Sequence, residues 1–502
     1  MNEQLAKLFR NAAVYGFGRI LGKVISFLLI PFYTHYFTAG EYGVMEILNL
    51  TAMIATVILA PGLSTAAMRF YYDSDDETER KLVISTGLLS TLLIGGAATL
   101  LVVLFPGWSS QVLLGSTKYA GLLQLVAIGF FFTFSADMGW VYLRGKQRSG
   151  LYTFLTQAVL IRSVLLNVLF VAVLKLGVAG TFWANVAAAG VVWCVLIVMT
   201  FREVGIHFSG TKLLALLKFG APLFTVWLAA FVLNYSDRFF LQRFHGIDVV
   251  GVYAVGYKFA YVLSLLAIQP FQLMWEPQSY EISKREDAAG LFSQIFVLYS
   301  VALISVAFFL SLSIREIFQL MVGGQFANAY RFVPLLAFAY VIQGMGLFFE
   351  AGLLIRKKNV TLSIIGTVST AACLLLNFAL IRTWAAWGAV WATFLSFAVL
   401  SCLSYWFSVK AYPFHCRVRT ILQVAVCSLA LLGIGSFVAP ESLGMRVAWK
   451  SLLALIFIFV LARLQLLPPG LLRALRSDAA AWARARLSPI FGRVSSPAKG
   501  VN

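Results

Sequence analysis

About fourteen apolar runs, each long enough to cross a lipid bilayer, follow one another along this chain of 502 residues. A helix needs about 20 predominantly apolar residues to span the hydrocarbon core of a membrane. The approximate limits of the runs are 11–36, 43–68, 82–105, 121–143, 151–174, 178–200, 219–241, 251–275, 289–311, 333–354, 360–381, 386–407, 420–437 and 446–466. The sequence therefore predicts an all-α integral membrane protein with about 14 transmembrane helices.

The composition excludes the common soluble classes of protein. Hydrophobic residues make up 61% of the chain and charged residues 12%, against about 45–50% and about 25% in soluble domains. A soluble enzyme, a secreted disulfide scaffold and a disordered protein are all excluded by this balance. The five cysteines form no CxxC pair and the four histidines have no metal-ligand spacing, so neither a metal site nor a cofactor is predicted.

The formal net charge of +19 reflects membrane topology. In a soluble chain such a charge would suggest a nucleic-acid partner, but basic residues also collect in the cytoplasmic loops of membrane proteins, and no nucleic-acid partner is expected. With a cytoplasmic N-terminus, most basic residues, including those at 144–148 and 356–358, fall inside, whereas Lys118 and Lys175 fall outside. We therefore expect a multi-pass protein with both termini in the cytoplasm.

Short motifs recur in the same order in the two halves of the chain. Four pairs of matching positions lie 208 or 210 residues apart: Gly43 and Gly251, Gly115 and Gly323, Gly180 and Gly388, and Asn167 and Asn377. A fixed long period of this kind indicates an internal structural repeat.

The repeat divides the chain into two parallel six-helix bundles, 1–205 and 210–412, followed by two additional transmembrane helices at 413–467. Parallel repeats are typical of transporters with a substrate site at the interface between the bundles, which favours a transporter over a membrane enzyme. Residues 468–502 form a basic cytoplasmic tail whose spacing suits an amphipathic helix on the inner leaflet, with a frayed soluble tail as the alternative.

Two segments resemble a known family. They read Gly18-Arg19-x-x-Gly22-Lys23-x-x-Ser26-Phe27, leading to Glu41-Tyr42-Gly43, and Asn234-Tyr235-Ser236-Asp237-Arg238-Phe239-Phe240-Leu241, followed by Gly251-Val252-Tyr253. Both are similar to segments of the bacterial polysaccharide-transporter family. Its members are the lipid-linked oligosaccharide, or O-antigen repeat-unit, flippases of the multidrug/oligosaccharidyl-lipid/polysaccharide exporter superfamily.

The resemblance implies a function in polysaccharide biosynthesis for the cell envelope, such as that of lipopolysaccharide. The implied substrate is an undecaprenyl-diphosphate-linked oligosaccharide, moved from the cytoplasmic to the periplasmic leaflet of the bacterial inner membrane. The implied partners are this lipid, membrane lipids and polysaccharide polymerase machinery. The family also implies a V-shaped cavity between the bundles, lined largely by spans 1, 2, 7 and 8.

Charged residues inside the first span are the leading candidates for substrate binding, because each costs about 2.5–3.5 kcal/mol at the membrane centre. Arg19 and Lys23 lie four residues apart and so share one face of a helix. Two like charges on one face need an anion, which a diphosphate would supply. The alternative is that the buried carboxylates of Glu46 and Asp137 neutralise them.

Three further residues complete the predicted substrate site. Lys258 has no acid on its own span and is expected either to line the cavity or to extend to the outer surface. Tyr15 lies one turn before Arg19, and Tyr257 adjoins Lys258. Each of these tyrosines is a candidate for the polar wall of the cavity.

The remaining charged residues of the spans are interpreted as structural or coupling groups. Arg162 is expected to brace the first bundle through Asp137. The neighbours Asp237 and Arg238 are expected to reach water near the outer end of span 7 and to anchor a loop there. Glu350 is expected to pair with Arg356 or Lys357.

Other functions are less well supported by the residues. A membrane-embedded polymerase needs acid and base groups outside the membrane, but the longest outer connection, about 312–332, holds the single acid Glu316. The sequence therefore predicts no enzymatic activity and no catalytic residues. A cation antiporter would favour buried acids, whereas this candidate set is basic. A lipid II flippase is the nearest alternative, although span 2 lacks the arginine expected of that subgroup.

Overall fold

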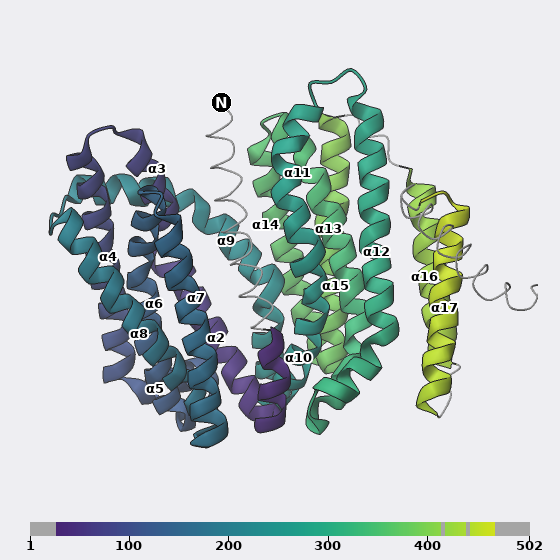
Figure 1. Ribbon diagram of the computed structural model, residues 1–502, viewed down its shortest axis with the longest axis horizontal. Helices are drawn as coiled ribbons and strands as arrows, with labels where there is room; N and C mark the ends of the chain where they lie inside the picture. Colours follow the sequence, from purple (N-terminus) through teal and green to yellow (C-terminus); the bar gives the residue numbers. More distant parts are fainter. Residues whose placement is uncertain (1–26, 413–416, 438–441, 467–502) are drawn as a thin grey trace, which may run out of the picture. The chain divides into compact units, whose positions relative to one another are not determined.

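The computed structural model describes residues 27–412, 417–437 and 442–466, and all the secondary structure in these ranges is helical (Figure 1). Twelve helical segments there are long and apolar enough to cross a membrane. One of them, Asn359–Ala411, has 53 residues and contains two of the predicted spans, separated near Ala385, whose φ is 48°. The predicted first span lies largely outside the described residues. The prediction of an all-α integral membrane protein with about 14 transmembrane helices is confirmed.

The helices group into two compact units. The first comprises Met1–Lys284 and Ile314–Pro413, and the second comprises Arg285–Ser313 and Phe414–Asn502. Helix α12 (Ala288–Met321) contributes to both. The division into two six-helix bundles and two additional helices is a different partition and stays a prediction.

The second unit contains α16 (Val418–Phe437), α17 (Leu443–Arg463) and the first part of α12. The rings of Phe308 and Phe457 stack with their centroids 4.3 Å apart. The ammonium of Lys450 donates a hydrogen bond of 2.5 Å to the backbone carbonyl of Leu312. Aromatic packing and this one polar contact therefore join α17 to α12.

The first half of the first unit begins with residues 27–36, which are helical. Its remaining helices are α2 (Ala39–Leu59), α3 (Leu63–Asp73), α4 (Glu77–Leu104), α5 (Pro106–Leu114), η1 (Thr117–Tyr119), α6 (Ala120–Gly145), α7 (Ser149–Asn167), η2 (Val168–Val173) and α8 (Gly177–Val204). Helix α6 packs between α4 and α8 (Figure 1). Side-chain caps set two of the helix starts, since Thr38 and Glu41 form a capping box before α2 and Asp76 caps α4.

The second half of the first unit repeats this order. Its helices are α9 (Gly210–His245), α10 (Ile247–Leu263), η3 (Ser264–Ile268), α11 (Gln269–Ile282), the end of α12, η4 (Gly324–Phe332), α13 (Val333–Ile355), α14 (Asn359–Leu376), η5 (Asn377–Ile381) and α15 (Arg382–Ala411). Helices α13 and α15 pack closely, and α9 packs against both α14 and α15.

Unusual backbone features recur 210 residues apart in these two halves. Gln147 and Lys357 both have φ of 55°, and Lys175 and Ala385 have φ of 54° and 48°. A left-handed backbone is uncommon at residues other than glycine, so two such pairs at one spacing are informative. In addition, one π-helix follows Asn167 and another begins at Asn377. These pairs support the internal repeat that the sequence motifs indicated.

Two repeat-related glycines lie against each other where α2 crosses α10. A Cβ atom on Gly43 would meet the backbone oxygen of Ile247, and a Cβ atom on Gly251 would meet the backbone oxygen of Ala39. No other residue has a side chain small enough for this crossing. The close approach brings the following turns of the two helices together, and these turns carry the charged residues described below.

Candidate functional site

A buried ion pair links α2 to α10 near the glycine crossing, with Glu46 one turn after Gly43 and Lys258 two turns after Gly251. The ammonium of Lys258 donates to the carboxylate of Glu46 at 2.6 Å and to the hydroxyl of Tyr42 at 3.2 Å. The Glu46 side chain is 7% exposed, whereas that of Lys258 is 32% exposed. Because Tyr42 and Glu46 lie four residues apart on α2, both reach the same ammonium. Lys258 is therefore held by two groups from the other half of the chain and still has one accessible side.

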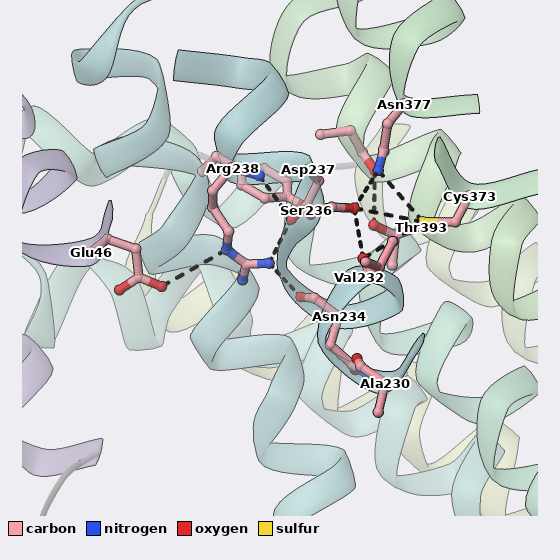
Figure 2. A network of polar contacts seen from close by, with 12 residues as sticks. Glu46, Ala230, Val232, Asn234, Ser236, Asp237, Arg238, Cys373, Asn377 and Thr393 are labelled. Atoms are coloured by element: carbon pink, nitrogen blue, oxygen red, sulfur yellow. Dashed lines mark hydrogen bonds and ion pairs between the residues drawn. The ribbon is translucent and has the colours of Figure 1, made fainter. Parts of the chain in front are cut away.

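Arg238 on α9 is the second cation of this site and is 1% exposed (Figure 2). Its Nη1 donates to the carbonyl of Asn234 at 2.6 Å and to Asp237 at 2.8 Å. Its Nε lies 3.8 Å from the nearer carboxylate oxygen of Glu46. Two acids and two cations therefore meet between α2, α9 and α10, and we call Glu46, Asp237, Arg238 and Lys258 the interhelical charge cluster.

Tyrosine rings surround the buried guanidinium. Its Cζ lies 3.8 Å from the ring centroid of Tyr257 and 5.4 Å from those of Tyr235 and Tyr253. A guanidinium over an aromatic face gains electrostatic stabilisation that increases when water is excluded. The hydroxyl of Tyr253 also donates to Asp237. The rings thus replace part of the hydration that Arg238 loses on burial.

The structure corrects the expectation that Asp237 and Arg238 reach water. Asp237 is 4% exposed and Arg238 is 1% exposed, because α2, α10, α14 and α15 all pack against α9. Depth along a predicted span does not show which neighbouring helices cover its end. The pair is an interior feature, where an unpaired charge would be costly.

Lys258 has a partner that the sequence did not reveal. Its own helix carries no acid near it, as expected, but Glu46 reaches it from a position 212 residues away in the sequence. Glu46 was considered a partner for Arg19 and Lys23, and in the structure it contacts Lys258 and Arg238. The spacing of residues within one helix cannot reveal this pair, because only the crossing of α2 and α10 brings Glu46 and Lys258 together.

The expected brace between Arg162 and Asp137 is wrong. Asp137 on α6 accepts a hydrogen bond from Ser64 on α3, whereas Arg162 lies on α7. The Nε atom of Arg162 is buried and has no hydrogen-bond partner within the described part of the chain. Positions along the predicted spans could not show that Ser64 on α3 reaches Asp137.

The expected pairing of Glu350 is also absent from the described ion pairs. Arg356 instead places its guanidinium 5.7 Å from the ring centroid of Tyr412. Helix α13 ends at Ile355, so Arg356 and Lys357 lie in the turn that follows, and Lys357 has a left-handed backbone. Arg356 and Lys357 therefore do not continue the helical register that would place them one or two turns from Glu350.

A second polar cluster, missed by the sequence reasoning, joins α9 to α14 (Figure 2). Asn377 donates to the hydroxyl of Ser236 at 3.0 Å and contacts the Cys373 sulfur at 3.5 Å. In the first half, the repeat-related Asn167 accepts a hydrogen bond of 2.9 Å from Tyr33. Asn167 thus connects the end of α7 to the helical residues 27–36, and Asn377 connects the end of α14 to α9. Each asparagine lies at the start of a π-helix or directly before one.

The other predicted substrate residues, Arg19, Lys23 and Tyr15, lie outside the described residues. Of the predicted set, the structure brings Lys258 and Tyr257 together with Glu46, Asp237 and Arg238. Within the described ranges, no group of three or more His, Cys, Asp and Glu side chains is arranged to hold a metal ion. The site offers fixed charges and aromatic faces rather than nucleophilic groups.

Comparison with known proteins identifies a family for this chain. The sequence profile of the family described as polysaccharide biosynthesis protein matches residues 8–283, more than half of the chain. A relative from Haemophilus influenzae, described as Lsg locus putative protein 1, is 21% identical over 335 residues, which is 65% of this chain and 80% of the relative.

Two solved structures have the same fold. The lipid II flippase MurJ, in an inward closed conformation, gives a TM-score of 0.72 at 15% identity and covers 91% of this chain and 99% of its own. An inward-facing multidrug resistance transporter of the MATE family gives a TM-score of 0.64 at 15% identity and covers 80% of this chain and 96% of its own. Likeness at this level of identity shows the fold.

Proposed function

This chain belongs to the polysaccharide biosynthesis protein family, and we propose that it is a flippase for undecaprenyl-diphosphate-linked oligosaccharide repeat units. It moves them from the cytoplasmic to the periplasmic leaflet of the bacterial inner membrane by alternating access. Membrane lipids surround it, and polysaccharide polymerase machinery receives its product. Both termini lie in the cytoplasm.

The observation that carries this proposal is the interhelical charge cluster. Alternating access needs an interface between the two halves that is packed in one state and released in another. Here Gly43 and Gly251 bring α2 and α10 together, and Glu46 pairs with Lys258 across the same crossing. An ion pair at such an interface forms in the packed state and is exchanged for hydration when the helices separate, so it can be made and released at a modest net free-energy cost.

Substrate binding would release the ion pair between Glu46 and Lys258. Lys258 is the cation of the cluster with an accessible side, and an incoming diphosphate competes there with Glu46. Arg19 and Lys23 of the first span add two more cations to the same cavity in this proposal. Several ammonium and guanidinium groups suit a diphosphate, which offers many acceptor oxygens.

When Lys258 leaves Glu46 to bind the diphosphate, Arg238 still compensates the negative charge of the Glu46 carboxylate. Arg238 stays within 3.8 Å of Glu46 and is fixed by Asp237 and Asn234. In this proposal the ring of Tyr257 stabilises the guanidinium of Arg238 through their cation–π contact, and Tyr15 contacts the sugar. Arg238 and Asp237 are thus coupling groups, and Lys258 is a ligand group.

The proposal is tested by complementation of a strain that lacks this protein. The double variant Arg19→Ala/Lys23→Ala and the single variant Lys258→Ala should abolish polymer export when each is compared with the wild type at matched membrane levels. Lys23→Arg should retain part of the activity, because the charge survives. The matched control is Lys118→Ala, an exposed cation on the predicted outer side, which should export normally. Full export by the double variant would remove the first span from the mechanism.

The alternative substrates predict different outcomes in the same strain. A lipid II flippase would support growth when the resident lipid II flippase is depleted, and a polysaccharide flippase would not. A cation antiporter needs an acid available to its cargo, whereas Glu46 is engaged by two cations. Complementation of lipid II transport with no effect on polymer export would replace the proposed substrate by lipid II.

A further inference from the structure

Corresponding loops of the two halves differ in how their cations are neutralised. In the first half, Lys146 pairs with Glu77 at 2.5 Å, and Arg148 makes a two-point contact with Glu203 at 2.5 and 2.9 Å. Tyr142 also donates to Glu203 at 2.8 Å. The basic loop at 144–148 is therefore tied to α4 and α8 by carboxylates of the protein itself.

The equivalent loop of the second half differs in its ion pairing among the described residues. Arg356, Lys357 and Lys358 follow α13 in the same turn geometry as the first loop, and all three are exposed. Within the described ranges, none of them forms an ion pair with an acid. At the repeat spacing of 208 residues, the position of Glu203 is occupied by Ala411. One carboxylate that neutralises the first loop is therefore missing here.

Helices α14 and α15 supply no replacement for it. No aspartate or glutamate occurs between Glu350 and Glu441, although this stretch contains α14, α15 and several cations. The end of α15 is held beside the loop, since Ser408 donates to the carbonyl of Phe349 at 2.7 Å. It adds Lys410, which is exposed as well. Four cations thus collect at one end of the α13–α15 pair without a carboxylate from this stretch.

Aromatic residues accompany these cations. Arg356 lies over Tyr412, and the ammonium of Lys410 is 3.6 Å from the ring centroid of Trp406, which is 52% exposed. Tryptophan and tyrosine are enriched at the level of the lipid headgroups. Exposed cations beside such rings are placed where phosphate groups of a bilayer lie.

We propose that Arg356, Lys357, Lys358 and Lys410 form a binding site for the phosphate headgroup of an anionic phospholipid. The lipid replaces the carboxylates that neutralise the corresponding loop of the first half. Arginine donates two hydrogen bonds to phosphate oxygens through its planar guanidinium, and lysine attracts the phosphate as a point charge. The cluster can therefore both hydrogen-bond a phosphate group and neutralise its negative charge. The site is distinct from the interhelical charge cluster and does not depend on the transported substrate.

Equilibrium binding of lipids to the purified full-length protein in neutral detergent tests this site. The probes are fluorescent phosphatidylglycerol and fluorescent phosphatidylcholine. The wild type should bind phosphatidylglycerol more tightly than phosphatidylcholine. In the triple variant R356Q/K357Q/K358Q the ratio of the two affinities should fall by about fivefold for each cation removed. The preference should also fall as the salt concentration rises.

Three controls make the result specific. The variant K118Q/K175Q/R243Q removes three exposed cations from the opposite helix ends and should keep the preference. The charge-preserving variant R356K/K357R/K358R should keep it too, which separates lost charge from misfolding. The variant K146Q/R148Q should keep it, because those cations are already paired.

Three outcomes would overturn the proposal. The first is an unchanged preference in R356Q/K357Q/K358Q. The second is an equal loss in K118Q/K175Q/R243Q, which would show a general charge effect. The third is binding of poly-glutamate at the loop in preference to phosphatidylglycerol, which would assign the surface to an acidic protein segment.

Discussion

The Glu46 carboxylate and the Lys258 ammonium, 212 residues apart in the sequence, form a hydrogen-bonded ion pair of 2.6 Å. The pair lies between α2 of the first half and α10 of the second. Helix packing brings these residues together, and the packing is closest where Gly43 meets Gly251. The contact therefore reports directly on whether the two halves are joined at this crossing.

Replacement of Lys258 by glutamine should destabilise the protein. The substitution leaves the buried carboxylate of Glu46 with Arg238 alone, at 3.8 Å, and loss of one member of a buried pair costs about 3 kcal/mol. The double variant Glu46→Gln/Lys258→Gln should recover part of this loss. Thermal unfolding of Lys258→Gln, Glu46→Gln and the double variant in detergent gives the coupling free energy, and additive losses would show that the two side chains do not interact.

The glycine crossing should tolerate no side chain. Alanine at Gly43 or at Gly251 places a Cβ atom on the backbone of the facing helix, so each substitution should lower the unfolding temperature and reduce membrane levels. Gly366→Ala on α14 is the matched control, because its Cβ would meet nothing within 4 Å. That control should stabilise the helix by about 0.5–1 kcal/mol. Equal unfolding temperatures for Gly43→Ala and Gly366→Ala would show that α2 and α10 do not cross there.

Asp237→Asn should affect stability more than a surface change of the same kind. Asp237 is 4% exposed and binds both Arg238 and Tyr253, so neutralising it should cost about 3 kcal/mol. Asp73→Asn removes an exposed pair with Arg69 and should cost less than about 0.5 kcal/mol. Membrane levels and unfolding temperatures check both values, and equal effects would contradict the burial of Asp237.

Membrane orientation gives a further prediction. In a variant without native cysteines, single cysteines at 146 and 357 should resist a membrane-impermeant maleimide in intact spheroplasts, whereas one at 118 should react. The expectation follows from the excess of basic residues on the side of the first two positions. Labelling of position 146 from outside would reverse the topology and move the proposed phospholipid site to the outer leaflet.

The sequence predicted the class of fold because each span carries its own signal. A run of about 20 apolar residues is helical in a membrane whatever its neighbours are, since the backbone has no other way to satisfy its hydrogen bonds. The pairs Gly43 and Gly251, and Asn167 and Asn377, indicated a repeat from the sequence alone, and backbone features of the described residues that recur 210 residues apart support it. These features need no knowledge of packing.

The charged site could not be predicted in the same way. Lys258 was identified as a candidate from its depth, but its partner Glu46 depends on how α2 crosses α10. Arg238 was placed at a wet surface because depth along α9 says nothing about the helices that cover it. Arg162 and Asp137 were paired wrongly because the sequence does not show that Ser64 on α3 reaches Asp137.

The leaflet distribution of undecaprenyl-diphosphate-linked repeat units, measured by their accessibility to an external glycosidase in spheroplasts, tests the proposed function most directly. Depletion of this protein should leave the units in the membrane but protected from the enzyme, and re-expression of the wild type should make them accessible. Lys258→Gln, at matched membrane levels, should leave them protected. Units that become accessible without the protein would contradict its assignment as their flippase.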